Sequence, residues 1–150
     1  MQRLREMILK YGEGIGDSIV KVDYFLNHRV DCALLWEMAG EIKEHFKAKG
    51  IDAVLTVEAS GIALASFAAL ALGVPMVFAK KYETKNQSDA CLEAKVHSFT
   101  HNKDYNIRIN AKHLNRGDGI LIVDDFLADG EAVRGMRELI KKAGCELKGI

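Results

Sequence analysis

Residues Ile120 to Val123 form an unbroken apolar run, which predicts a parallel strand that is covered on both faces. Apolar residues then recur at helical spacing, at Ala132, Val133, Met136, Leu139, Ile140 and Ala143. This spacing predicts a helix after the strand. The polar residues between the two, rich in small side chains, are expected to form a loop from the end of the strand to the start of the helix.

The same patterns predict earlier elements. Asp31 is expected to N-cap a helix that ends at Gly50, with an apolar face made of Leu34, Leu35, Met38, Ile42 and Phe46. A strand is predicted at 53–57. Residues 62–72 are Ala- and Leu-rich on nearly all sides, which predicts a helix buried between the sheet and a neighbouring layer. The segment 73–75, with its Gly and Pro, is expected to end that helix.

Strands and helices continue to alternate further along the chain. A strand is predicted at 76–79, and the polar run 80–89, which lacks an apolar period, predicts a mobile loop. Residues 95–99 and 105–110 alternate enough to pair as antiparallel strands, and 147–150 resembles the start of another strand. The expected fold class is therefore α/β, with a mostly parallel central sheet flanked by helices.

Composition limits the alternatives. The chain has 150 residues, 49% hydrophobic and 28% charged, which suits one domain over residues 1–150. Lys plus Arg and Asp plus Glu number 21 each, so the net charge of zero offers no broad attraction for nucleic acid or membrane. The charged start at 1–6 is followed by no long apolar run, so neither a secretory signal nor a membrane span is expected and the predicted location is cytoplasmic.

Cysteine and histidine positions give no sign of a redox or metal motif. The cysteines Cys32, Cys91 and Cys145 are odd in number and widely spaced, which favours reduced thiols. His97 and His101 could in principle share a metal ion, but no third ligand lies near them in the sequence. No metal-binding residue is therefore predicted.

The loop after the 120–123 strand is the strongest candidate for chemistry. Ligands of open α/β sheets bind where strands end and helices begin, and unpaired N–H groups there attract anions. The predicted phosphate-binding residues are Ala128, Asp129, Gly130, Glu131 and Ala132. Asp124 and Asp125 precede them, and one of these carboxylates can reach ribose hydroxyls while the other supports the loop or a water. The alternative is that Asp125 caps a turn and Asp124 is solvated.

Three further positions carry candidate chemistry. The turn of Glu58, Ala59, Ser60 and Gly61 follows the 53–57 strand, and its small residues let backbone N–H groups approach a diphosphate; the alternative is a plain turn with Ser60 as N-cap. Lys80 and Lys81 could neutralise diphosphate oxygens or be a solvated pair. The Asn27 amide could read the edge of a purine or satisfy local backbone groups.

These segments resemble a known family. Residues 120–132 resemble the PRPP-binding motif of type I phosphoribosyltransferases, and their Asp-Asp-Phe-Leu-Ala-x-Gly form is similar to that of xanthine-specific members. The match continues in the family's order, with 20–28 resembling the base-binding stretch, 58–63 the pyrophosphate loop, 73–81 the second strand and basic turn, and 96–100 the return from the mobile loop. The resemblance covers essentially the whole chain.

The resemblance implies a fold and a reaction. Residues 1–30 would form an amino-terminal hood segment over the base, and 31–150 the PRPP-binding core, with a non-proline cis peptide in the pyrophosphate loop. The implied reaction transfers 5-phosphoribosyl from PRPP to N9 of xanthine, giving xanthosine monophosphate and pyrophosphate, with Mg²⁺ bound to PRPP. A homodimer is implied as well.

Residue roles follow from the same resemblance. Asp124 and Asp125 would orient the ribose and favour its developing positive charge, and 128–132 would bind the 5-phosphate. Pyrophosphate would bind at 58–61 and Lys81. Val20 and Asn27 would select the base.

The chain departs from the family pattern at several points. Asp129 stands where relatives carry a neutral Asn or Thr, and its carboxylate would repel a phosphate unless turned outward. Ala132 lacks the hydroxyl that many relatives have, and the chain stops where the family continues into a carboxyl-terminal hood, so this hood is expected to be absent. Two alternatives stay open: a PRPP-sensing regulator without turnover, and a salvage enzyme for hypoxanthine, guanine or adenine.

Overall fold

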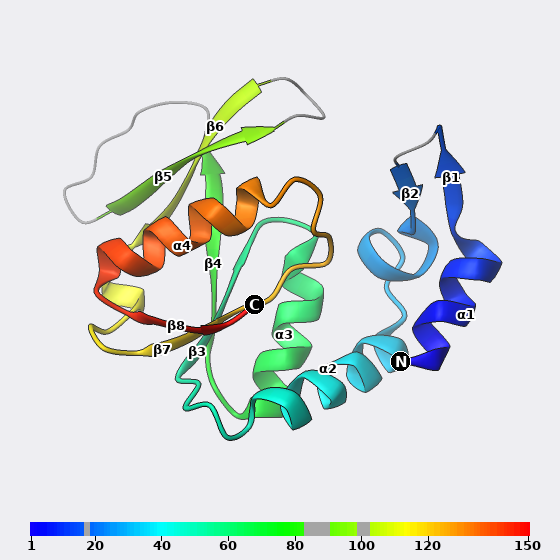
Figure 1. Cartoon of the computed structure of the whole chain (residues 1–150), viewed down its shortest axis with the longest axis horizontal. Coiled ribbons are helices and arrows are strands. Elements are labelled where there is room, and N and C mark those ends of the chain that lie inside the picture. The colour runs from blue at the N-terminus through cyan, green and yellow to red at the C-terminus, as the bar shows by residue number, and fades with distance from the viewer. Residues whose placement is uncertain (17–18, 83–90, 99–102) are drawn as a thin grey trace.

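The structure is a computed structural model that describes residues 1–16, 19–82, 91–98 and 103–150 (Figure 1). The helices are α1 (Gln2–Tyr11), α2 (Cys32–Phe46), α3 (Gly61–Leu72) and α4 (Glu131–Ala143), with a π-helical turn at Asp23–Asn27 and a 3-10 turn at Ala111–His113. The strands are β1 (Glu13–Ile15), β2 (Ile19–Lys21), β3 (Ala53–Val57), β4 (Met76–Tyr82), β5 (Cys91–Ser98), β6 (Lys103–Asn110), β7 (Gly119–Ile122) and β8 (Glu146–Gly149). No helix in these described ranges is long and apolar enough to cross a bilayer.

The main sheet has the strand order β5-β6-β4-β3-β7-β8. Strands β4, β3, β7 and β8 run parallel, whereas β6 runs antiparallel to both β4 and β5. Figure 1 shows the β5–β6 pair at the upper end of β4, beyond the parallel part of the sheet. The predicted mostly parallel sheet with an added antiparallel pair is confirmed, and so is the strand predicted from residue 147.

The central strands are buried on both faces because helices cover each side. Every residue of β3 and β7 is buried. Side chains alternate between the two faces, so Leu55 and Ile122 join the apolar cluster under α4, while Val54 and Leu121 join the cluster under α2 and α3. This two-sided burial explains why both strands are continuous apolar runs in the sequence.

Helix α2 begins as predicted but ends early. The Asp31 carboxylate accepts a hydrogen bond from Leu34 N at 3.0 Å, which caps the helix. The helix stops at Phe46, so the prediction that Gly50 ends it is wrong. Gly50 instead has a φ of 64° in the turn that leads to β3, a conformation that favours glycine there as strongly as at a helix end. Gly73, with a φ of 75°, ends α3 as predicted.

Strand β4 is longer than its sequence pattern indicates. It continues through Lys80, Lys81 and Tyr82, so the prediction of a loop from residue 80 is wrong for these residues. They pair with Arg108, Ile107 and Asn106 of β6. Backbone pairing with a partner strand holds this polar end extended, and hydrophobic periodicity does not reveal it. The rest of the predicted loop, residues 83–89, lies outside the described residues, as do Phe99, Thr100 and His101.

The amino-terminal residues 1–31 fold at one end of the molecule, beside the start of α2 (Figure 1). Val22, Phe25 and Leu26 of this segment are buried in the same apolar cluster as Leu34 of α2. Arg3 of α1 also forms an ion pair with Asp31 at 3.1 Å. The predicted hood segment is therefore joined to the core by buried apolar contact.

Candidate active site

The carboxyl ends of β3 and β7 lie next to each other because the two strands are parallel neighbours. The turn Glu58–Gly61 follows β3, and Asp124 and Asp125 follow β7. The two segments are in contact, since Ser60 Oγ donates a hydrogen bond to Asp125 Oδ1 at 2.9 Å. The predicted pyrophosphate turn and the predicted ribose carboxylates thus form one site, at the edge where open α/β sheets bind ligands.

The Glu58–Gly61 turn has side-chain and backbone features beyond those of a simple helix start. The Glu58–Ala59 peptide bond is cis, as the family resemblance implies. Glu58 Oε1 accepts a hydrogen bond from Lys81 N at 2.7 Å. Ser60 occupies the N-cap position directly before α3, but its hydroxyl makes no capping hydrogen bond and reaches Asp125 instead. The alternative of a plain turn with Ser60 as N-cap is therefore right about the position of Ser60 and wrong about a cap by its side chain, and diphosphate binding by this turn stays a prediction.

Gly61 lets α3 begin close to the carboxylates. A Cβ at Gly61 would lie 2.3 Å from Thr56 Oγ1 and 2.5 Å from Asp124 Oδ1, both far inside van der Waals contact. Thr56 is fully buried, so it has little room to move. Only glycine fits between these two oxygens.

Asp124 has an unusual electrostatic environment. Burial raises the pKa of its carboxyl group, and the neighbouring charge of Asp125 raises it further, to about 7. The Asp125 N–H, which donates to Asp124 Oδ1 at 3.0 Å, and the charge of Lys81 act in the opposite direction. At neutral pH both protonation states of Asp124 are populated, and a nearby positive charge would favour the ionised one.

Asp125 joins the amino-terminal segment to the site. Its Oδ1 accepts from Ser60, and its Oδ2 accepts from Asn27 Nδ2 at 3.3 Å. Asp125 therefore caps no turn, and Asp124 is partly buried rather than solvated. The alternative in which Asp125 caps a turn and Asp124 is solvated is therefore wrong, and the ribose contacts of the two acids stay a prediction.

The loop after β7 lines a small cavity and contains main-chain N–H groups without hydrogen-bond partners among the described residues. Gly130, with a φ of 75°, precedes α4, and the first helical hydrogen bond runs from Arg134 N to Gly130 O at 2.8 Å. The N–H groups of residues 128–133 donate to no atom of the described residues. They border a cavity of about 130 Å³, lined by His97, Tyr105, Phe126, Leu127, Ala128, Asp129, Gly130, Glu131, Ala132 and Val133. Such unpaired N–H groups at a helix start can bind an anion.

The acidic side chains of this loop differ from each other. Asp129 is exposed and lines the cavity. Glu131 forms an ion pair with Arg134 at 2.6 Å and accepts a weak hydrogen bond from His97 N at 3.5 Å. These contacts lower the pKa of the Glu131 carboxyl, and the hydrogen bond from the Arg134 guanidinium has the largest effect. Glu131 is thus held by protein groups, and only its main chain is available to a ligand.

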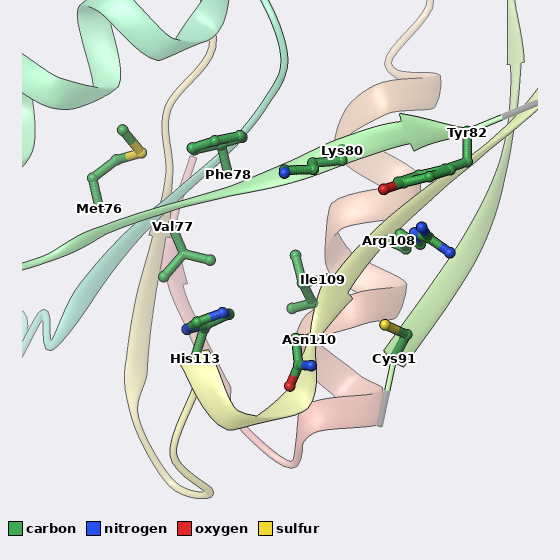
Figure 2. Close-up of a pocket in the computed structure, with 10 residues that line it drawn as sticks. All are labelled: Met76, Val77, Phe78, Lys80, Tyr82, Cys91, Arg108, Ile109, Asn110 and His113. Atoms are coloured by element: carbon green, nitrogen blue, oxygen red, sulfur yellow. The ribbon is translucent and has the colours of Figure 1, made fainter. Parts of the chain in front are cut away.

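Lys80 and Lys81 lie on opposite faces of β4. The Lys81 Nζ lies 5.4 Å from the centroid of the Tyr105 ring, and its charge lowers the pKa of Asp124. Lys80 lines a separate pocket of about 360 Å³, where its Nζ lies 6.0 Å from the Phe78 ring centroid (Figure 2). The structure therefore brings Lys81 to the predicted site and turns Lys80 away from it.

Two residues of the cavity, Tyr105 and His97, were not predicted as phosphate-site residues. They come from β6 and β5, and although His97 lies in the 96–100 segment, no motif assigned either side chain to the phosphate loop. One pattern could have found Tyr105. It alternates with Ile107 and Ile109, which are buried under α4, so all three side chains share one face of β6.

The base-binding predictions have a partial structural basis. The Asn27 amide bonds to Asp125, which places Asn27 beside the predicted ribose site. Val20 lies half-exposed on β2. Contact of either residue with a base stays a prediction.

Metal binding by side chains alone finds no support in the part of the chain that the structure describes, where no group of three or more His, Cys, Asp or Glu could hold an ion. His97 Nδ1 pairs with Asp104 Oδ1 at 2.7 Å. Mg²⁺ typically binds through one or two carboxylates together with substrate phosphates. Glu58 and the adjacent carboxylates of Asp124 and Asp125 fit such a shared site.

The fold and this site define a class of protein. The sequence model of the phosphoribosyl transferase domain matches residues 25–150, which include every site segment described above except Val20. The chain therefore belongs to the phosphoribosyltransferase family, whose members are transferase enzymes.

Particular relatives resemble the whole chain. It is 46% identical to the xanthine phosphoribosyltransferase of Clostridioides difficile, with 100% of this chain and 80% of that protein aligned. It is 48% identical to the xanthine phosphoribosyltransferase of Heliobacterium modesticaldum, with 99% of this chain and 79% of that protein aligned.

Solved structures support the fold. Adenine phosphoribosyltransferase from Saccharomyces cerevisiae, complexed with an imino-altritol bisphosphate and adenine, superposes with a TM-score of 0.77 at 22% identity, covering 97% of this chain and 84% of that chain. The enzyme from Giardia lamblia, complexed with 9-deazaadenine, gives a TM-score of 0.76 at 23% identity, covering 91% and 75%. The predicted type I phosphoribosyltransferase fold is confirmed.

Proposed function

We propose that this chain transfers the 5-phosphoribosyl group of PRPP to N9 of xanthine, which yields xanthosine monophosphate and pyrophosphate in purine salvage. The observation that carries the proposal is the set of N–H groups at residues 128–133, which have no hydrogen-bond partner within the described part of the chain and follow the carboxylates of Asp124 and Asp125. The similarity to xanthine phosphoribosyltransferases supports xanthine as the base.

The loop and the carboxylates would bind different parts of the phosphoribosyl group. Ala128, Asp129, Gly130, Glu131 and Ala132 would bind the 5-phosphate through their main-chain N–H groups. Asp124 and Asp125 would orient the ribose hydroxyls. As the C1–O bond breaks, the sugar gains positive charge, and ionised carboxylates nearby stabilise that charge. Catalysis is then mostly positioning and charge stabilisation.

The turn at residues 58–61 and Lys81 would bind the pyrophosphate group. The Lys81 main-chain N–H donates to the Glu58 side chain, and the Lys81 ammonium lowers the pKa of Asp124. The ammonium group would therefore be placed to bind a leaving diphosphate. Mg²⁺ bound with PRPP would neutralise diphosphate charge when present. Ala59, Ser60 and Gly61 add small side chains that leave the backbone accessible.

The base would lie under the amino-terminal segment. Asn27 is tied to Asp125, and its amide oxygen remains an acceptor for a purine edge. Val20 would add apolar contact. Residues 1–30 would then act as a hood and 31–150 as the PRPP-binding core of one domain, in a homodimer located in the cytoplasm.

A turnover assay tests the proposal directly. The protein is incubated with PRPP, Mg²⁺ and one base at a time: xanthine, hypoxanthine, guanine or adenine. Formation of xanthosine monophosphate, at a higher kcat/KM than any other nucleotide, is the expected result. If another base is turned over in preference, that base replaces xanthine as the proposed substrate. If PRPP binds but no nucleotide forms, the result favours a PRPP-sensing regulator.

The two adjacent lysines supply a matched pair for the pyrophosphate site. Lys81→Ala is expected to raise the KM for PRPP about tenfold, because a charge-assisted contact to the diphosphate is lost. Lys80→Ala is the control, because Lys80 lies over Phe78 in the other pocket. Equal effects of the two substitutions on this KM would remove Lys81 from the site.

A further inference from the structure

The phosphate loop has no side chain that can donate a hydrogen bond to an anion. Its residues 128–132 are Ala-Asp-Gly-Glu-Ala, and its two acidic side chains are negatively charged. Among the residues that line the loop cavity, only His97 and Tyr105 carry side-chain donors. His97 Nδ1 is already paired with Asp104 Oδ1. The Tyr105 hydroxyl differs from this ring, because it has no hydrogen-bond partner among the described residues and is open to a ligand of the cavity.

The position of this wall relative to the loop is fixed by close contacts between α4 and the β5–β6 pair. A Cβ at Gly135 of α4 would lie 2.5 Å from Val96 Cγ2, so the helix approaches β5 more closely than a larger residue at this position would allow. Arg134 Nη2 donates to Lys95 O at 3.4 Å, and His97 N donates to Glu131 Oε2. Because β5 and β6 are paired at Val96 and Tyr105, the same contacts hold Tyr105 facing the start of α4.

Tyr105 is suited to donate a hydrogen bond. It is partly buried against the apolar cluster under α4, and its hydroxyl has no hydrogen-bond partner among the described residues. Burial raises the pKa of the hydroxyl, and the charges of Asp124 and Glu131 raise it further. Burial and the two negative charges all disfavour the phenolate, so the hydroxyl stays protonated and can donate to an anion.

We propose that the Tyr105 hydroxyl is a ligand of the 5-phosphate group, and that it supplies the side-chain donor that the loop itself lacks. The inference rests on the proposed function, since it assigns a further residue to the same site. The Tyr105 ring has a separate role, because Lys81 lies over it. The hydroxyl therefore acts on the 5-phosphate and the ring acts on the lysine of the pyrophosphate side.

Tyr105→Phe separates these two roles, because it removes the hydroxyl and keeps the ring under Lys81. The matched control is Tyr82→Phe, which removes a hydroxyl in the separate pocket of Figure 2, where the Tyr82 ring lies under Arg108. Binding of ribose 5-phosphate and of magnesium pyrophosphate is measured by titration calorimetry for both variants and the unaltered protein. Circular dichroism establishes that each variant is folded.

The expected result is selective. Tyr105→Phe raises the Kd of ribose 5-phosphate about tenfold and leaves the Kd of pyrophosphate unchanged, since one hydrogen bond to a charged group is lost. Tyr82→Phe changes neither Kd. Unchanged binding of ribose 5-phosphate by Tyr105→Phe overturns the inference, and so does an equal loss of both ligands, which indicates a general structural effect.

The unaltered protein distinguishes this inference from the proposed function. If it binds ribose 5-phosphate and PRPP while Tyr105→Phe binds them equally well, only the assignment of Tyr105 fails. If it binds neither compound and forms no nucleotide, the proposed function fails and the assignment of Tyr105 fails with it.

Discussion

Gly61 and Asp124 lie so close together that the size of one controls the surroundings of the other. The absent Cβ of Gly61 leaves room for Asp124 Oδ1 against the start of α3. This closeness helps to bury the Asp124 carboxyl, and burial is the main cause of its raised pKa. A single glycine thus contributes to the charge state of a proposed catalytic residue.

Gly61→Ala is expected to lower the free energy of unfolding by about 1 to 3 kcal/mol, because the new methyl group overlaps two oxygens in a packed region. Urea unfolding measures the change. Gly40→Ala is the control: Gly40 lies on the exposed face of α2, and a Cβ there meets nothing within 4 Å. This control is expected to gain about 0.5 to 1 kcal/mol from higher helix propensity. Equal stability of the two variants would contradict the close packing at Gly61.

Asp124→Asn is expected to change how stability depends on pH. The raised pKa means that the folded protein holds this proton more tightly than the unfolded chain does, so the group stabilises the fold at low pH. That stabilisation is lost as the pH rises from about 4 to about 7. The amide cannot ionise. The variant should therefore match the unaltered protein near pH 4 and exceed its free energy of unfolding by about 1 to 2 kcal/mol at pH 8, after allowance for solvent screening.

Urea unfolding at pH 4, 6 and 8 gives this comparison for both proteins. A stability difference that is the same at all three values would show that Asp124 titrates normally. The variant is also expected to lose most of its transferase activity, because the negative charge that would face the ribose is removed.

Single residues also show where sequence reasoning succeeds and where it stops. The sequence placed Asp124, Asp125 and the 58–61 turn at strand ends, because strand ends are readable from apolar runs. That the two strands are neighbours, so that the segments touch, was shown by the fold. Tyr105 was not predicted as a site residue, because only the fold brings it to the cavity that the phosphate loop also lines. The hydrogen bond between Asn27 and Asp125 was not predicted either, because it joins residues 98 positions apart.

At the scale of elements, α2 connects the amino-terminal segment to the core. Asp31 caps its first turn through Leu34 N and also pairs with Arg3 of α1. The cap satisfies a helix N–H that has no other partner, whereas the ion pair is partly exposed and contributes little. The Asp31 carboxylate therefore contacts both α1 and α2, and its cap of α2 contributes more to stability than its ion pair with α1.

Asp31→Ala is expected to lower the free energy of unfolding by about 1 kcal/mol, because the cap is lost. Asp31→Asn keeps an oxygen for the cap and weakens only the ion pair, so its loss should stay below about 0.5 kcal/mol. Thermal and urea unfolding of the two variants measure the difference. An equal loss of stability in the two variants would assign the main effect to the ion pair.

Elements with strong periodicity were predictable, and those defined by pairing were not. The β3, β7 and α4 elements follow their apolar patterns closely, because both faces of the sheet are buried. Helix α3 begins one residue before its predicted start and ends where predicted, but Leu70 is exposed, so the prediction that it is buried on nearly all sides is wrong. The last residues of β4 are polar and extended only because β6 pairs with them. Helix α1 was not predicted, and it has no buried residue that would mark its face.

At the scale of the whole molecule, the proposed active site combines two parts of the chain. The core supplies the loop after β7 and the turn after β3. The amino-terminal segment supplies Asn27, which reaches Asp125 across this boundary. The order of these segments along the chain made the family recognisable from sequence, whereas their contacts required the fold.

Asn27→Ala is expected to raise the KM for xanthine about fivefold to tenfold, with a smaller change in the KM for PRPP, if the amide faces the base. Because Asn27 is exposed, the free energy of unfolding should change by less than about 0.5 kcal/mol. Steady-state kinetics with each substrate varied in turn supply the two constants. A rise in the KM for PRPP alone would show that Asn27 acts only by holding Asp125.

Strand β4 belongs to two ladders, and this has a consequence for the proton affinity of Asp124. Residues 76–79 pair with β3, and 80–82 pair with β6. Pairing with the antiparallel strand β6 therefore places Lys81 and Tyr105 together, while Asp124 follows the parallel strand β7. Since the Lys81 ammonium makes Asp124 more acidic, the antiparallel ladder influences a carboxyl group that belongs to a different part of the sheet.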